Sequence, residues 1–176
     1  ILASLKYNLR FAGLKIERNE ISASGFKTFG KAIEDKNIVN VLHLARGTIG
    51  PEKASVLSKM LRTNRNLLLL YLDSSQMGFR EARILAAGLR HSKSLVKLNI
   101  NGNLIGDQGF CAPIEALKIN RSLCRLDVRD SKITSNGASA FADLLLLNTT
   151  LSEIDISGND LGPDGITVIA ECLTTN

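Results

Sequence analysis

Apolar residues recur along this chain with an unbroken period of 28 residues. Within each period they take offsets zero, three, five and ten, and a small polar residue or glycine takes offset eight. The frames, which we number repeat 1 to repeat 6, begin at Phe11, Val39, Leu67, Leu95, Leu123 and Leu151. The alternating apolar positions at the start of each frame predict a short strand. The fixed period predicts a solenoid, in which each unit buries its apolar face against its neighbours.

The second half of each frame has a different spacing. Apolar residues stand at offsets 18 and 22 in most frames, for example Leu57 with Leu61 and Leu85 with Leu89. A separation of four residues places both on one face of a helix, which we expect over offsets 13 to 23. Asparagine recurs at offset 25, where a turn former suits the reversal of the chain. Pro113 is expected to delay the start of its helix or to bend it, because proline cannot donate the intrahelical bond.

Each unit is therefore expected to run strand, loop, helix, turn. Successive strands must then lie parallel in one sheet, and we expect them to centre on residues 42–44, 70–72, 98–100, 126–128 and 154–156. A helix in every unit makes the helix side wider than the strand side. The solenoid should consequently curve with the strands inside.

The run from Leu95 to Gly109 reads Leu-x-x-Leu-x-Ile-x-x-Asn-x-Ile-x-x-x-Gly, which resembles a leucine-rich repeat of the ribonuclease-inhibitor-like class. The resemblance implies an α/β horseshoe with parallel strands on the concave face and helices on the convex face. The class includes NOD-like receptors, Ran GTPase-activating proteins, tropomodulin-like actin regulators and bacterial effectors. Ribonuclease inhibitor itself carries many cysteines at offset eight, whereas Gly47 stands there in repeat 2 and brings no side chain to bond the neighbouring loop.

The two ends of the sequence favour a single leucine-rich repeat domain over residues 1–176 that is cut from a longer array. Residues 1–10 match the end of a preceding frame, and the last frame stops before its full length. Natural arrays end in capping units with a polar outer face, and neither end has this character.

Composition suggests the setting. No apolar run approaches the roughly 20 residues needed to cross a bilayer, so no membrane contact is expected. Cys111, Cys124 and Cys172 are odd in number and fall at unrelated offsets, which fits neither a disulfide framework nor a metal site. We expect an intracellular, cytoplasmic protein without a cofactor.

Charge is distributed unevenly along the chain. Residues 1–94 carry 16 Lys and Arg against 7 Asp and Glu, a net charge of +9. Residues 95–176 carry 6 against 10, a net charge of −4. This gradient either steers a partner of complementary charge or only keeps the helix faces soluble. Specific nucleic-acid binding is disfavoured, because the phenylalanines fall on core-facing helix columns and supply no stacking platform.

The register predicts which side chains line the concave face. Offsets two, four and six alternate with the buried strand positions and should point into the hollow. Val41, His43, Leu69 and Tyr71 are then adjacent on two neighbouring strands, and Tyr with aliphatic residues is typical of an interaction hot spot. The candidate partner-binding residues are Val41, His43, Leu69, Tyr71, Asp73, Lys97, Asn99, Arg125, Asp127, Arg129 and Asp155.

The acidic part of this face allows a second interpretation. Asp127 and Asp155 are expected to face each other on neighbouring strands, with Arg125 and Arg129 supplying the opposite charge. Paired carboxylates can serve acid–base catalysis, but a solvated charge ladder explains the same residues. The sequence contains no phosphate-binding glycine loop, paired histidine ligands or nucleophile elbow, so we expect no enzyme.

The sequence therefore predicts a non-enzymatic scaffold that binds another protein through the concave strand face. One alternative is the regulatory array of a larger protein, namely a NOD-like sensor, an actin-filament regulator or a GTPase-activating protein. A second alternative is an intramolecular role, in which the array packs on another domain of its own parent protein.

Overall fold

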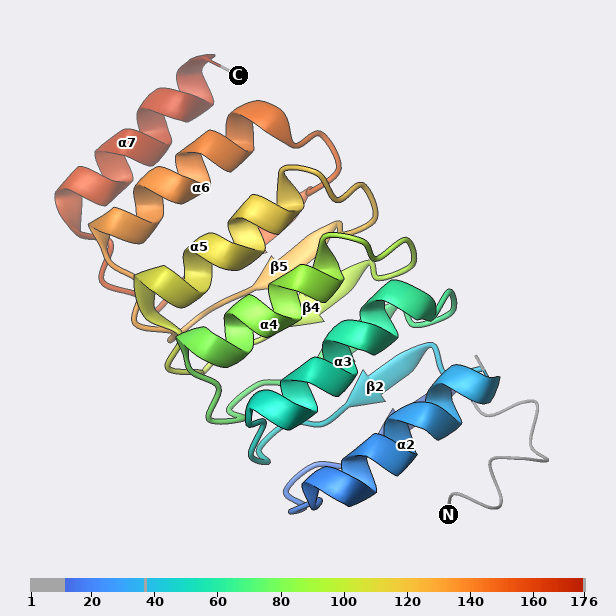
Figure 1. Ribbon diagram of the computed structural model, residues 1–176. Helices are drawn as coiled ribbons and strands as arrows, with labels where there is room; N and C mark the ends of the chain where they lie inside the picture. Colours follow the sequence, from blue (N-terminus) through green and yellow to red (C-terminus); the bar gives the residue numbers. More distant parts are fainter. Residues whose placement is uncertain (1–11, 37, 176) are drawn as a thin grey trace.

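The computed structural model describes residues 12–36 and 38–175. Strands and helices alternate along this part of the chain, each strand being followed by one helix (Figure 1). The elements are β1 (Gly13–Lys15), α2 (Ala23–Lys36), β2 (Val41–His43), α3 (Pro51–Thr63), β3 (Leu69–Tyr71), α4 (Phe79–Leu89), β4 (Lys97–Asn99), α5 (Gly106–Leu117), β5 (Arg125–Asp127), α6 (Ser135–Leu147), β6 (Glu153–Asp155) and α7 (Gly162–Thr175). The partial unit expected at residues 1–10 lies outside the described residues.

The six strands form one parallel sheet in the order β1-β2-β3-β4-β5-β6. Every pair is in register at the sequence period, so that Leu42 lies beside Leu70 and Leu70 beside Leu98. The helices stack in the same order along one face of this sheet (Figure 1). The parallel solenoid is thus confirmed, although each strand is centred on offset three, slightly earlier than expected.

The helices begin and end close to the expected offsets, with one correction at Pro113. The helix α5 begins at Gly106 and continues through Pro113 to Leu117, so the proline does not delay its start. The first turn forms before the proline is reached, because Gly109 N donates to Ile105 O at 3.1 Å. Pro113 is itself buried at offset 18 and takes the place of the apolar residue that other repeats have there.

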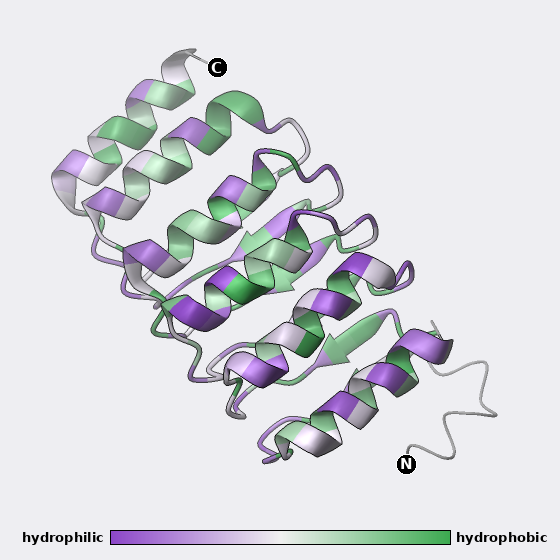
Figure 2. Cartoon of the chain, in the orientation of Figure 1, coloured by the Kyte–Doolittle hydropathy of each residue, from purple (hydrophilic) through white to green (hydrophobic). Residues whose placement is uncertain are grey.

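The core is one continuous apolar layer between the sheet and the helices. Leu98 and Ile100 in the centre of the array are fully buried, as are the central leucines of β2 and β3. Figure 2 shows hydrophobic residues on the strands and on only part of each helix. The phenylalanines expected in the core are buried there: Phe26, Phe29, Phe110 and Phe141. Leu173 departs from this pattern with 59% exposure, because no further helix of the described residues packs on that side of α7.

Asparagine at offset eight ties neighbouring repeats together in pairs. The Asn103 side chain accepts from Ser75 N at 2.9 Å and Met77 N at 3.0 Å, both in the preceding repeat. Its amide donates to Leu72 O at 2.9 Å and Ile100 O at 2.7 Å. Asn159 repeats this set of bonds between repeats 6 and 5. We call these bonds the asparagine tie.

The corresponding position between repeats 2 and 1 holds Gly47, which has no side chain to form the tie. Asn19, one repeat earlier, is exposed, and its one side-chain bond to the described residues is to Glu17 O in its own repeat, at 2.9 Å. The first two repeats therefore lack the asparagine tie that joins repeats 3 with 4 and 5 with 6. They are joined by the sheet, by helix packing and by surface side-chain contacts such as Lys59 Nζ with Glu34 Oε2 at 2.8 Å.

The asparagines at offset 25 fix the turns after α3, α5 and α6, as the sequence suggested. Asn120 accepts from Ser122 N and Leu123 N at 2.9 and 2.8 Å, and its amide donates to Leu89 O at 2.8 Å in the repeat before. Asn64 accepts in the same way, but its buried Nδ2 has no hydrogen-bond partner within the described part of the chain. Asn120 and Asn148 donate through this amide to the repeat before, so the bond missing at Asn64 is the one that would reach repeat 1, at the same junction as Gly47.

Candidate binding surface on the strand face

The strand face is built from the first and third residues of each strand. The middle residue of each strand points to the core, because side chains alternate across a sheet. The first positions form the column Gly13, Val41, Leu69, Lys97, Arg125 and Glu153, and the third positions form the column Lys15, His43, Tyr71, Asn99, Asp127 and Asp155. Both columns agree with the sequence prediction.

An aromatic pair occupies the centre of the basic half of this face. The rings of His43 and Tyr71 are stacked, with centroids 3.9 Å apart and planes inclined by 8°. Lys97 lies on the next strand with Nζ 5.5 Å from the centroid of the Tyr71 ring, within the range of a cation–π contact. Val41 and Leu69 are paired in the neighbouring column and are half-buried. We call these five residues the aromatic patch.

A carboxylate on the first repeat borders the aromatic patch. Glu17 Oε1 lies 3.0 Å from Lys15 Nζ and 3.8 Å from His43 Nδ1. The hydrogen bond from Lys15 lowers the pKa of Glu17, with smaller contributions from nearby positive charges, against an opposing effect of burial. Glu17 therefore stays ionised beside the ring of His43. Sequence reasoning placed it at offset six but did not include it among the candidate residues.

Asp73 and Asn99 lie beside the patch but differ in exposure. Asp73 is half-buried at the end of its strand, and its backbone carbonyl accepts from Arg46 N at 2.8 Å. Asn99 is only 8% exposed, and its side chain accepts from Asn101 N at 3.0 Å. Asn99 therefore lies in the expected column of the strand face, but it contributes little accessible surface there. Its amide turns back to the loop after β4, where it satisfies a backbone donor.

Asp127 is also turned inward. It is 9% exposed, and Arg129 binds it through Nη2 at 2.7 Å and Nε at 3.0 Å. Asn101 Nδ2 donates to the same carboxylate at 3.3 Å. With its oxygens held by these donors, Asp127 contributes to the structure of the face more than to its exposed surface.

Arg129 links the two facing carboxylates of the acidic half. Its Nε lies 3.0 Å from Asp127 Oδ1 and 3.2 Å from Asp155 Oδ2, so a single guanidinium compensates the charges of both carboxylates. Hydrogen bonding and charge from Asp127 raise the pKa of Arg129. The hydroxyl of Ser157, 2.6 Å from Asp155 Oδ1, and then its backbone N–H lower the pKa of Asp155.

Arg125 was wrongly expected to share this role. It pairs instead with Glu153 on the next strand, with 3.0 Å between Nε and Oε2. The two residues stand opposite each other in the register, so the long arginine side chain reaches across the strands rather than along its own. The acidic half is therefore a set of closed ion pairs, whereas the aromatic patch presents half-buried apolar, aromatic and cationic side chains.

Two other kinds of site are not found. Among residues 12–36 and 38–175, no three His, Cys, Asp or Glu side chains come together as a possible metal site. None of the helices described combines the length and the apolar character needed to span a bilayer.

Comparison with known proteins supports the fold. A family model for the leucine rich repeat matches residues 91–110, 120–142 and 147–170. No curated protein matches the sequence.

Solved structures share the architecture at low sequence identity. The actin-binding site 2 of leiomodin-1 matches with a TM-score of 0.57 and 18% identity, over 99% of this chain and 88% of that one. The tropomodulin C-terminal domain of Caenorhabditis elegans matches with a TM-score of 0.59 and 14% identity, over 98% and 91%. An internalin of Listeria monocytogenes matches with a TM-score of 0.56 and 16% identity, over 91% of this chain and 46% of that one.

The six strand–helix units, the family model and these folds agree with one another. The chain therefore has the fold of an α/β leucine-rich repeat solenoid, and it is similar to leucine rich repeat proteins over the matched residues.

Proposed function

We propose that the chain is a non-enzymatic protein-binding module whose partner contacts the strand face at the aromatic patch. The stacked pair of His43 and Tyr71 carries this proposal. Stacking fixes both rings before a partner arrives, so little side-chain entropy is lost on binding. Tyrosine in such a position is the residue type that dominates measured hot spots.

The surroundings of the pair suit a protein surface. Val41 and Leu69 add apolar area beside the rings, and Lys15 and Lys97 are cations at the border of the patch. Apolar centre and charged rim are the usual arrangement of an interface. Reversal of Lys15 and Lys97 to Glu should mainly slow association with an acidic partner, and added salt should mask this defect.

Actin is the partner that we propose to test first. The leiomodin-1 domain is described as an actin-binding site, and it aligns with almost the whole of this chain. This match favours the actin-regulator version of a regulatory array over a NOD-like sensor or a GTPase-activating protein, and over packing within one parent protein.

The test is a titration of labelled monomeric actin with the chain, followed by fluorescence anisotropy. Tyr71→Ala should weaken binding by about 2 kcal/mol or more, as truncated tyrosine anchors do. His43→Ala should weaken it less, because Tyr71 keeps its contact with Lys97. Arg83→Ala, an exposed change on α4, is the control and should leave the affinity unchanged.

Two results would contradict the proposal. Wild-type protein that does not bind actin would exclude this partner. Equal affinity for Tyr71→Ala and wild type, together with a loss in Arg83→Ala, would transfer the binding site to the helix face.

A further inference from the structure

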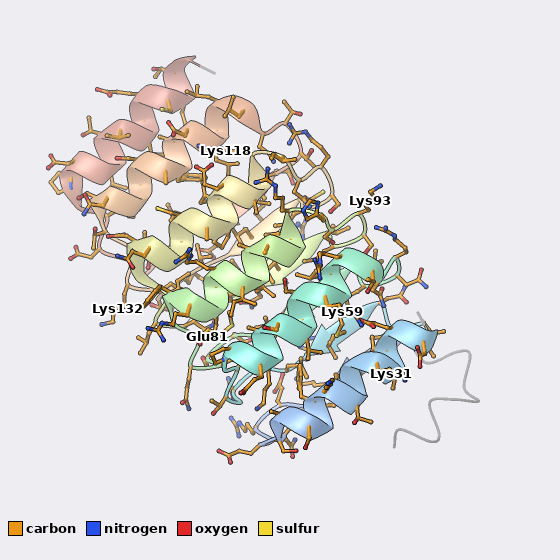
Figure 3. All side chains as sticks on the ribbon, viewed as in Figure 1. Lys31, Lys59, Glu81, Lys93, Lys118 and Lys132 are labelled. Atoms are coloured by element: carbon orange, nitrogen blue, oxygen red, sulfur yellow. The ribbon has the colours of Figure 1, made fainter. Side chains whose placement is uncertain are left out.

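Basic side chains gather at the edge of the solenoid where the helices end. Figure 3 labels Lys93 at this edge, and Glu81 and Lys132 at the opposite one. These residues form two columns at the turns after α3, α4 and α5. The column at offset 23 is Arg62, Arg90 and Lys118, and the column at offset 26 is Arg65, Lys93 and Arg121. Offset 23 holds Glu34 in repeat 1 and Leu146 in repeat 5, so the cluster is limited to three neighbouring turns.

These turns enclose an open hollow of about 530 Å³, which we call the edge hollow. Its cationic and titratable lining residues are Arg62, Arg65, Arg90, His91, Lys93 and Arg121. The rest of the lining is Ser92, Ser122, Asn120 and Ile119, so it contains no carboxylate.

Some of the basic residues have structural roles. Lys118 is neutralised by Glu115 at 2.7 Å and Asp143 at 3.4 Å, and it does not line the edge hollow. Arg121 Nη1 donates to Lys118 O and Asn120 O, each at 3.0 Å, which fixes its guanidinium at the end of α5. Arg62, Arg90 and Lys93 are exposed, and no carboxylate of the described residues forms an ion pair with them.

Helix ends alone do not account for this charge. Each helix C-terminus is equivalent to roughly half a negative charge, so three helices supply about 1.5. Arg62, Arg90 and Lys93, which line the edge hollow and pair with no carboxylate of the described residues, already carry three positive charges. A surplus of positive charge therefore remains, and it faces a concave, solvent-open space.

An exposed apolar column connects the edge hollow with the strand face. Leu68 and Val96 are 38% and 36% exposed, and Val96 N donates to Leu68 O at 2.8 Å, so they lie side by side. They follow Arg65 and Lys93 by three residues and directly precede Leu69 and Lys97. A single extended segment can thus contact the edge hollow and the aromatic patch together.

We propose that the edge hollow binds an acidic peptide segment of the protein partner. The planar guanidiniums match carboxylate groups through paired hydrogen bonds, which a lysine cannot offer. Ile119, 51% exposed, and the Leu68–Val96 column receive apolar side chains of the same segment. The lining has no Phe, Tyr or Trp ring on which a nucleobase stacks, which favours a peptide over single-stranded nucleic acid. The proposal rests on the protein-binding function proposed above.

The test uses a fluorescein-labelled peptide of alternating glutamate and leucine, titrated with the whole chain and followed by anisotropy. The site variant is Arg62→Gln with Arg90→Gln and Lys93→Gln. The control variant is Lys27→Gln with Lys31→Gln and Arg83→Gln, which removes the same charge from exposed helix positions. We expect the site variant to lose about ten-fold or more in affinity and the control to stay within about two-fold at 150 mM salt, where distant charges are screened.

Three results would overturn the proposal. The first is that the wild type does not bind the peptide. The second is that the site variant and the control variant lose the same affinity. The third is that the site variant loses binding to anionic vesicles or to single-stranded DNA but keeps its affinity for the peptide. The Tyr71→Ala variant distinguishes the two proposals. If Tyr71→Ala loses affinity for actin while the site variant keeps its affinity for the peptide, the proposal for the strand face is supported and the proposal for the edge hollow is contradicted. The reverse result would reject the strand face and retain the edge hollow.

Discussion

The pair of repeats 1 and 2 has the same strand and helix order as the pairs 3 with 4 and 5 with 6, but it is joined differently. Asn103 and Asn159 each bond the loop of the repeat before, whereas Gly47 leaves the first junction without these bonds. The buried amide of Asn64 faces the same junction without a partner in the described residues. A constant sequence period therefore does not imply constant coupling between repeats. The period determines the register of the backbone, whereas the asparagine tie depends on the single side chain at offset eight. In solenoids, stability is approximately a sum of repeat and nearest-neighbour terms, so repeat 1 should open first.

The largest effect should come from truncation of the central core. Leu98→Ala removes a fully buried side chain between two packed repeats and should cost about 2–5 kcal/mol in the free energy of unfolding. Leu14→Ala makes the same change in repeat 1, where the leucine is half-buried, and should cost clearly less. Urea denaturation followed by circular dichroism gives both values, and equal losses would contradict the difference between the two regions.

Removal of an asparagine tie should have the next largest effect. Asn103→Ala leaves buried backbone groups of Ser75, Met77 and Leu72 without partners, and should cost roughly 2–4 kcal/mol. Asn19→Ala, at the same offset, loses one exposed hydrogen bond and should change the stability by less than about 0.5 kcal/mol. Similar values for the two variants would show that the tie does not couple the repeats.

A smaller effect is expected when the missing tie is supplied. Gly47→Asn places an amide where Asn103 has one, and should stabilise the first junction by about 1 kcal/mol. A Cβ at this position lies 3.2 Å from Asn19 O, so the loop of repeat 1 must shift by a few tenths of an ångström. Hydrogen exchange at the amides of β1 and β2 measures the local gain. Faster exchange in the variant would mean that the glycine is required for close approach.

The smallest effect is expected on the acidic half of the strand face. Asp155 is paired with Arg129 but its side chain is 39% exposed, so Asp155→Ala should change the stability by no more than about 0.5 kcal/mol at neutral pH. The lowered pKa of Asp155 means that its contribution is present above the unfolded pKa of about 3.9 and is lost as the pH falls through the folded value. Urea midpoints of wild type and variant should therefore converge in acid, and a gap that widens below pH 4 would contradict the assignment.

The sequence predicted the fold because backbone register follows from the spacing of apolar residues alone. Leu42, Leu70 and Leu98 lie in one buried row, and Tyr71 lies beside His43, as the period requires. The register determines the position of each Cα and the face to which its side chain points, but it does not determine which neighbouring group the side chain bonds. Asn99 and Asp127 were therefore placed in the correct column, but the register did not show that local hydrogen bonds hold them close to the loops, and Arg125 was given the wrong partner.

The edge hollow was missed for a different reason. The net charge was summed over half of the chain, so Arg62, Arg90 and Lys93 were counted together with basic residues that lie far from them in the structure. Reading the sequence by columns shows that offsets 23 and 26 are basic in three successive repeats. That signal was present, and only the hollow between the turns required the structure.

The asparagine tie has a consequence for how such an array can grow. Asn103 and Asn159 bond backbone N–H and carbonyl groups of the loop one repeat earlier, and these groups do not depend on the side chain of that loop. An asparagine at offset eight can therefore form the tie with any repeat that precedes it in register. Length variants of this array, natural or engineered, should tolerate the insertion or deletion of a single 28-residue repeat.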